Sequence, residues 1–162
     1  MAIQYGRAKE AALDEFGLTE RTLDPDFAPL TWRTAASVTA DAASPGSDAI
    51  TLSLAPEMPV LVLERVTGLP PAAYMFAQTV GGSEAGKGLQ LRWRILCPQS
   101  LLKTPLWQQP VPVPRGRIRY QSRIEVPVNC PLQTWQLTAY LEGQQSEATF
   151  RIEALELKRL AR

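Results

Sequence analysis

The residues of this sequence whose type and spacing best suit binding of a ligand are arginines, which occur at alternate positions in two short segments. They lie in residues 87–123, which contain eight Lys and Arg residues and no acidic residue, whereas residues 1–86 contain five basic and eleven acidic residues. Alternate residues of a β-strand point to the same face, roughly 6.5 Å apart, close to the phosphate spacing of a nucleic acid. If both runs lie in one sheet, five guanidinium groups share one surface. These residues are Arg92, Arg94, Arg117, Arg119 and Arg123.

Such a surface would bind carboxylates or phosphates, because the planar guanidinium group pairs with either of them through two hydrogen bonds. We expect another protein with an acidic surface as the partner, and nucleic acid or another polyanion is the alternative. The chain's own acidic N-terminal part would serve equally well, and the arginines could also form a solvated strand face with no partner. The residues that alternate with the arginines, including Trp93, Ile118 and Tyr120, point to the opposite face. No aromatic ring is therefore placed to stack on single-stranded bases, which favours the protein partner.

Catalytic and metal chemistry are disfavoured by residue type. The chain contains no histidine, which removes the usual general base near neutral pH and the commonest metal ligand. The acidic pairs Asp14–Glu15 and Asp24–Asp26 lie in polar stretches with no sign of a desolvated cleft. We therefore predict no catalytic residue, no metal site, no cofactor and no enzymatic activity.

A glycine-rich segment, 81–88, nearly matches the phosphate-binding loop G-x-x-x-x-G-K-[ST]. Gly88 stands where that motif needs a hydroxyl group, and a strand pattern follows where the motif needs a helix. We interpret the segment as a flexible hairpin loop.

The four tryptophans are the residues suited to stacking on a sugar. Trp93 and Trp135 lie in apolar rows of alternating segments and are expected in the core. Trp107 lies between Pro105 and Pro110, so we expect it to make surface contacts with a partner.

Alternating apolar and polar residues, interrupted by turns, predict β-strands through most of the chain. Three prolines confine the segment 106–113 to a sheet edge or to polyproline II. After residue 153 the apolar positions shift to Leu155 and Leu157, so residues 153–162 could begin a terminal helix or continue the last strand through a bulge, and we favour the continued strand. The predicted strands are 50–54, 60–66, 73–80, 89–96, 106–113, 117–126 and the two arms of 132–154.

The segment 132–154 is predicted to be an antiparallel hairpin turning at Gly143. Its register would pair Trp135 with Phe150 and Leu137 with Ala148, apolar against apolar. An arginine-bearing strand, a tryptophan-bearing strand and a phenylalanine-bearing strand in this order resemble the last strands of an immunoglobulin-like domain. The resemblance is architectural, because a Cys-Trp-Cys framework is missing.

We therefore predict a mainly β protein, an antiparallel β-sandwich of immunoglobulin-like architecture with a short N-terminal helix at residues 7–16. Residues 1–49 would form an extension and residues 50–162 the sandwich. Fourteen prolines and ten glycines agree with short strands and turns. No apolar run approaches the roughly twenty residues of a membrane span.

The two cysteines, Cys97 and Cys130, each precede a proline. A disulfide fits their spacing, but the N-terminus lacks the pattern of a signal peptide and we expect a cytoplasmic protein with free thiols. The predicted function is a non-catalytic adaptor or assembly module. It would bind another protein through Arg92, Arg94, Trp107, Arg117, Arg119 and Arg123.

Overall fold

Two antiparallel sheets form the part of the chain that the computed structural model describes, which is residues 32–34, 39–42, 50–54, 60–82, 88–100, 104–141 and 148–161. Sheet A has the strand order β1-β4-β9-β6-β7, and sheet B has the order β2-β3-β10-β5-β8. The strands are β1 (Arg33–Thr34), β2 (Thr39–Ala42), β3 (Ile50–Leu54), β4 (Val60–Thr67), β5 (Ala72–Gly82), β6 (Leu89–Leu96), β7 (Trp107–Pro112), β8 (Gly116–Val126), β9 (Gln133–Leu141) and β10 (Ala148–Arg159).

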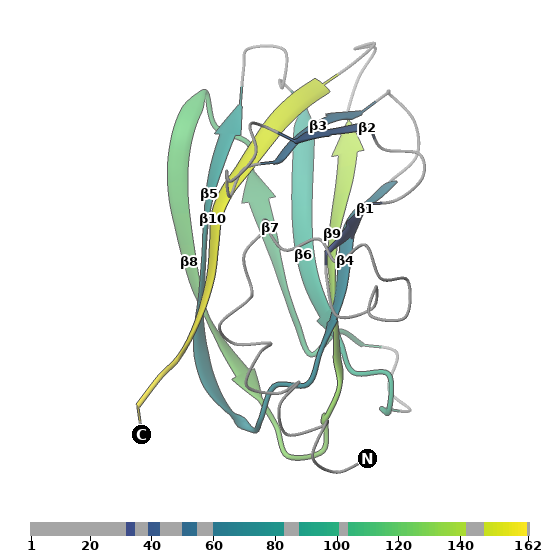
Figure 1. The fold of residues 1–162 in the computed structure, drawn as a ribbon, viewed down its shortest axis with the longest axis vertical. Coiled ribbons are helices and arrows are strands. Elements are labelled where there is room, and N and C mark those ends of the chain that lie inside the picture. The colour runs from purple at the N-terminus through teal and green to yellow at the C-terminus, as the bar shows by residue number, and fades with distance from the viewer. Residues whose placement is uncertain are drawn as a thin grey trace.

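The sheets pack face to face, as Figure 1 shows, and enclose one hydrophobic core. Phe76 of sheet B lies at the centre of an aromatic cluster from sheet A. Its ring centroid is 5.4 Å from that of Trp93, 5.3 Å from that of Trp135 and 6.1 Å from that of Trp107. These tilted and edge-on arrangements are the favoured geometries of aromatic pairs. The predicted antiparallel β-sandwich is confirmed at this level.

The alternation of apolar and polar residues correctly predicted which side chains of the central strands are buried and which are exposed. In β6, Leu91, Trp93 and Ile95 are buried while Gln90 and Arg92 are exposed. β7 lies at the edge of sheet A, as its prolines require, because a proline nitrogen cannot donate to a neighbouring strand.

The final strand continues through a bulge, as predicted. Its pairing with β5 shifts between Glu153 and Glu156, and Ala154 has a φ angle of 49°. The extra residue restores the apolar phase, so that Ile152 before the bulge and Leu155 after it are both buried.

Both predicted hairpins are wrong. β9 pairs with β4 and β6 in sheet A, whereas β10 pairs with β3 and β5 in sheet B. Trp135 therefore lies opposite Arg65 and Ile95 in its sheet, and Phe150 lies opposite Leu52 and Gly82 in the other.

The strands β5 and β6, which flank the glycine-rich segment, also belong to different sheets. Two apolar rows separated by a turn can pair side by side or face each other across a core, and the period of two is the same in both cases. The immunoglobulin-like resemblance rested on the final hairpin and loses that support.

Edge position also changes the start of β8. Ile118 was predicted to point to the face opposite the arginines; Ile124 and Val126 of the same strand are buried, yet the side chain of Ile118 is 46% exposed. Among the described strands β8 pairs only with β5, so this outermost strand of sheet B has less cover than the strands inside the sheet.

The N-terminal predictions fall mostly outside the described residues, including the helix at residues 7–16. β1 pairs with β4 and β2 pairs with β3, and Trp32 is buried, so residues before position 50 take part in the sandwich. The division at residue 49 stays a prediction. None of the ranges that the structure describes contains a helix long and apolar enough to cross a membrane.

A disulfide closes one end of sheet A. Cys97, directly after β6, is bonded to Cys130, shortly before β9, with a Cα–Cα distance of 5.6 Å. The expectation of free thiols is therefore wrong, and the disulfide links two neighbouring strands covalently. Disulfides persist in oxidising compartments and are rare in the cytosol. The pairing counts against a cytoplasmic location, which stays a prediction.

Beside the disulfide, a buried glutamine connects three segments. The side-chain oxygen of Gln133 accepts hydrogen bonds from the Thr67 hydroxyl (3.0 Å) and from the backbone N–H of Leu69 (2.8 Å). Its amide nitrogen donates to the carbonyl groups of Leu69 and Cys130. The Thr67 hydroxyl in turn accepts from the Trp135 indole at 3.0 Å. Because these groups are buried, each bond avoids the cost of an unpaired polar atom.

Candidate functional site

The outer face of sheet B carries three of the arginines singled out from the sequence, and its geometry follows from the small side chains of β5. In its outward positions this part of β5 carries Ala77, Thr79 and Gly81, and Gly81 lies directly between Arg117 of β8 and Arg151 of β10. Long side chains from the two flanking strands can therefore reach over β5 and meet.

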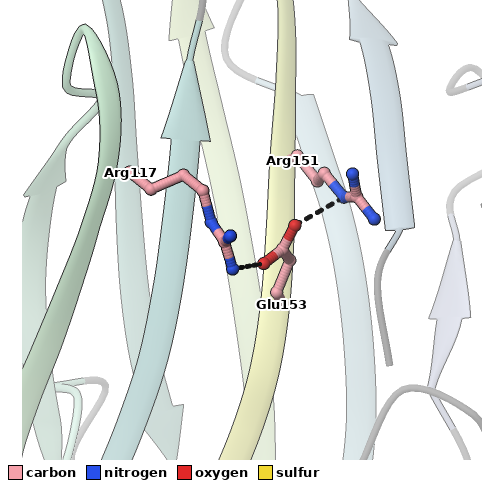
Figure 2. Close-up of polar contacts among 3 residues, drawn as sticks. All are labelled: Arg117, Arg151 and Glu153. Carbon is pink, nitrogen blue, oxygen red and sulfur yellow. Dashed lines mark hydrogen bonds and ion pairs between the residues drawn. The ribbon is translucent and has the colours of Figure 1, made fainter. Parts of the chain in front are cut away.

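Figure 2 shows the result at one end of this face. The Arg117 side chain extends from β8 across β5 to the Glu153 carboxylate on β10, where it forms an ion pair. Arg151 approaches the other oxygen of the same carboxylate from the opposite side, with its Nε 2.7 Å from Oε1. The side chain of Glu153 is only 13% exposed, so its charge is held between two guanidinium groups.

The pattern repeats further along the same strands. Arg119 lies 3.1 Å from Glu156, whose carboxylate is also 3.5 Å from the ammonium group of Lys158. Arg123 lies 2.9 Å from Glu125 on its own strand. Each of the three β8 arginines is therefore paired with a glutamate from the same face. The acidic partner that we expected from another molecule is supplied by the chain itself.

Arg92 and Arg94 lie elsewhere. They are on β6, and β6 belongs to sheet A while β8 belongs to sheet B. The condition for a single basic surface, two arginine-bearing strands in one sheet, is not met. Alternation showed which side of each strand is outward, but the outer faces of the two sheets point in opposite directions.

The outer face of sheet A is organised in rows that cross the strands. In the first row Glu64 of β4, Gln136 of β9 and Arg94 of β6 lie directly opposite one another. Arg94 donates from Nε to the Gln136 side-chain oxygen at 2.7 Å, and the Gln136 amide nitrogen donates to the Glu64 carboxylate at 2.6 Å. Gln108 of β7 extends the row on the far side of Arg94.

Two further rows follow along the same face. The second places Thr138 of β9 beside Arg92 of β6 and Pro110 of β7, and the third places Tyr140 beside Gln90 and Pro112. Tyr140 is 41% exposed and is the aromatic ring that this face presents in the outward row of β9. By strand geometry it lies roughly 13 Å along β9 from Gln136.

Sequence reasoning missed Glu64, Gln136 and Tyr140. A signal for Tyr140 was present, because an aromatic residue occupied the polar half of an alternating strand, where solvent exposure is expected. Glu64 and Gln136 had no such signal. They become part of the candidate site because the register of β4, β9 and β6, which are far apart in sequence, places them beside Arg94.

Trp107, predicted to contact a partner, is half-buried and turns toward the interior. Its ring centroid lies 6.1 Å from that of Phe76 and 6.4 Å from that of Trp135. Trp32 is likewise 5.5 Å from Trp93 in the core. The tryptophans therefore build the interior of the sandwich, and the outward aromatic of sheet A is a tyrosine.

The face of sheet A has the chemical groups of a recognition surface. It combines amide, hydroxyl, guanidinium and carboxylate groups with one exposed ring, all on paired strands that fix their spacing. Within the residues whose placement is described, no group of three or more Cys, Asp and Glu side chains could hold a metal ion.

Several solved structures that share this fold are carbohydrate-binding modules. The chain is similar to a family 4 carbohydrate-binding module with a TM-score of 0.59 and 10% identity, over 89% of this chain and 97% of that one. A family 61 module, solved in complex with β-1,4-galactotriose, gives a TM-score of 0.58 and 15% identity, over 92% and 98% of the two chains. A structure of carbohydrate-binding modules from the β-sandwich superfamily gives 0.55 and 11%, over 88% and 60%. No protein-family model and no curated protein matches this chain.

These likenesses confirm the β-sandwich and correct the predicted function. An adaptor for another protein, or a binder of nucleic acid, was expected from the arginines. Several proteins that share the fold over most of this chain are instead carbohydrate-binding modules. The predicted partners, an acidic protein surface or a nucleic acid, are wrong for the same reason, and the internal pairing of the β8 arginines removes their physical basis.

Proposed function

We propose that this chain is a non-catalytic carbohydrate-binding module and that its ligand lies on the outer face of sheet A. The fold likeness to carbohydrate-binding modules supports the general class. The observation that carries the choice of face is the hydrogen-bonded row of Glu64, Gln136 and Arg94, with Tyr140 on the same side.

The row suits a sugar because hydroxyl groups both donate and accept hydrogen bonds. An amide, a carboxylate and a guanidinium group side by side offer both functions within a short distance. The hydrogen bonds within the row also hold these side chains in place before a ligand arrives, which lowers the entropy cost of binding. The Tyr140 ring adds a flat apolar surface against which the C–H face of a sugar ring can stack.

The outer face of sheet B is the less suitable alternative. Its guanidinium and carboxylate groups already bond to each other, as in the pairs of Arg117 and Arg119. A sugar would have to break those pairs or bind to groups whose charge is already balanced. The outward positions of β5 beside those pairs, Ala77, Thr79 and Gly81, also offer no aromatic ring on which a sugar could stack.

Affinity electrophoresis and titration calorimetry with a panel of polysaccharides test the proposal. The panel includes β-1,4-galactan, xylan, mixed-linkage β-glucan and uronate-containing polymers. Tyr140→Ala and Gln136→Ala are each expected to weaken binding of the recognised polymer about tenfold or more, which corresponds to one lost stacking or hydrogen-bonding group.

Arg119→Ala on β8 is the matched control, since it also removes an exposed polar side chain from a strand. It should leave the affinity unchanged. The absence of binding to every polymer in the panel would reject a carbohydrate-binding function. Equal losses in the sheet A variants and in Arg119→Ala would reject the assigned face.

A further inference from the structure

The guanidinium group of Arg94 is held in a fixed orientation that leaves donors directed outward. Its Nε–H donates to Gln136, and Gln136 is anchored in turn by its own bond to Glu64. Among the residues whose placement is described, Nε is the one side-chain atom of Arg94 with a hydrogen-bond partner. The two terminal nitrogens of a half-buried, oriented side chain thus remain as donors.

Arg92 adds a second group beside it. It lies two residues away on the same face of β6, roughly 6.5 Å distant by strand geometry, and is exposed. Its neighbours across the strands are Thr138 and Pro110, neither of which is charged. In the described ranges neither Arg92 nor Arg94 forms an ion pair, whereas Arg117, Arg119 and Arg123 each do.

This part of the face therefore has a surplus of donors. A sugar hydroxyl uses only part of that surplus, because it donates as readily as it accepts. A carboxylate accepts only, and its planar geometry matches the planar guanidinium group through two parallel hydrogen bonds. Among sugars, the uronic acids carry that group.

We infer that the ligand of this face contains a uronic acid residue, whose carboxylate binds to the terminal nitrogens of Arg94 with Arg92 as the second donor. The inference rests on the proposed carbohydrate-binding function and specifies its ligand class. It concerns one oriented guanidinium group and one carboxylate of a sugar. It does not depend on total positive charge, since Arg117, Arg119 and Arg123 of the chain's basic segment lie on the other sheet.

The test compares polysaccharides that differ only at the carboxyl group. Polygalacturonate, alginate and glucuronoxylan are each measured beside their carboxyl-reduced forms, in which the uronic acid becomes the corresponding neutral sugar. The full chain is titrated at two salt concentrations. We expect at least one acidic polymer to bind about tenfold or more tightly than its reduced form, as for a charged hydrogen bond.

Four variants test whether binding depends on the oriented guanidinium group of Arg94 or only on the total positive charge of the protein. Arg94→Gln and Arg94→Lys should both remove most of the preference for the acidic form, because lysine keeps the charge but lacks the planar pair of donors. Arg92→Gln, at an exposed position, should reduce the preference partly. Arg123→Gln makes the same charge change on sheet B and should leave the preference intact.

Each outcome has a separate meaning. Binding to neutral polymers with no preference for the acidic forms overturns the uronate inference and leaves the carbohydrate-binding function standing. Full preference in Arg94→Lys, or equal losses in Arg94→Gln and Arg123→Gln, also overturns it. Binding to no polymer at all, acidic or neutral, overturns the proposed function itself. Thermal unfolding of each variant confirms that the losses do not come from misfolding.

Discussion

The outer faces of the two sheets use the same residue types in opposite ways. On sheet B the arginines of β8 meet glutamates of β10 and β8, and their charges are balanced within the face. On sheet A, Arg94 meets a neutral amide, so its orientation is fixed while its charge is not neutralised. Small residues on β5 allow the first arrangement, and the register of β9 with β6 produces the second.

This difference teaches that the number of arginines is a poor guide to a binding surface. Sheet B has more of them, and five of its basic side chains are already in ion pairs. Exposed ion pairs contribute little to stability, but they occupy the donors that a ligand would need. Sheet A, with fewer charges, keeps its donors available.

Removing the disulfide should have the largest effect and should act on sheet A first. The bond spans a sequence separation of 33 residues, and closing a loop of that length is expected to contribute about 3 to 4 kcal/mol to the free energy of unfolding. Urea unfolding of the double variant Cys97→Ser/Cys130→Ser measures this loss.

Hydrogen exchange then tests where the loss is felt. Amides near the ends of β6 and β9 should exchange faster in the double variant than amides of β5 and β10, since the bond links the first pair of strands. If the exchange rates rose equally in both sheets, the prediction that the disulfide mainly stabilises sheet A would be wrong.

Gly82→Ala should destabilise the sheet B side. A Cβ atom at this position would lie 2.5 Å from both the Pro114 carbonyl oxygen and the Val113 side chain, so backbone must shift. We expect a loss of about 1 to 3 kcal/mol, as for overpacked sites. Gly81→Ala is the control, because its Cβ would meet its nearest neighbour at 3.5 Å, an ordinary contact. Equal denaturation midpoints for the two variants would show that the close approach at Gly82 is relieved at no cost.

Glu153→Gln/Glu156→Gln should turn the balanced face into a basic one at a small cost in stability, about 1 kcal/mol or less. Four cationic side chains that now share these two carboxylates would become available. The variant should elute from heparin at clearly higher salt than the wild-type chain. Glu125→Gln, which frees one arginine, should shift elution less. Unchanged elution of the double variant would mean that the pairs do not restrain this face.

The pH dependence of Tyr74, on the inner side of β5, should give the smallest effect. Burial raises the pKa of its hydroxyl above the usual 10.0, and the nearby charge of Arg159 opposes this in part. A raised folded-state pKa favours the neutral phenol, so this contribution to stability is present below pH 10 and declines as pH rises above it. The hydroxyl also donates to the Pro70 carbonyl at 2.7 Å.

Tyr74→Phe should therefore show a shallower loss of stability between about pH 9 and pH 11 than the wild type, as measured by denaturant unfolding at each pH. Parallel curves for the two proteins would show that burial does not perturb this hydroxyl group.

Much of the fold was readable from local patterns. Alternation identified the buried row of β6 and that of β9, prolines identified β7 as an edge strand, and the shift to Leu155 and Leu157 identified the bulge of β10. Each of these features depends on a few consecutive residues. The pairing of Trp135 with Phe150 failed because it needed a partner, and the alternation of a strand does not specify one.

The candidate site divides in the same way. Arg92 and Arg94 were identified from their spacing alone, and their outward direction was correct. Their separation from Arg117, Arg119 and Arg123, and the link from Arg94 through Gln136 to Glu64, could not be predicted, because they depend on which strands become neighbours.

For the strands inside each sheet, the sequence by itself determined which side chains face the core and which face water, since burial of apolar surface follows the two-residue period of each strand. Only the tertiary structure decided which sheet a strand joins and which charges are paired. An apolar side chain can be buried against any apolar neighbour. A hydrogen bond or ion pair instead requires that strand register bring two particular groups together. The same arginines are therefore balanced on one sheet and open to a ligand on the other.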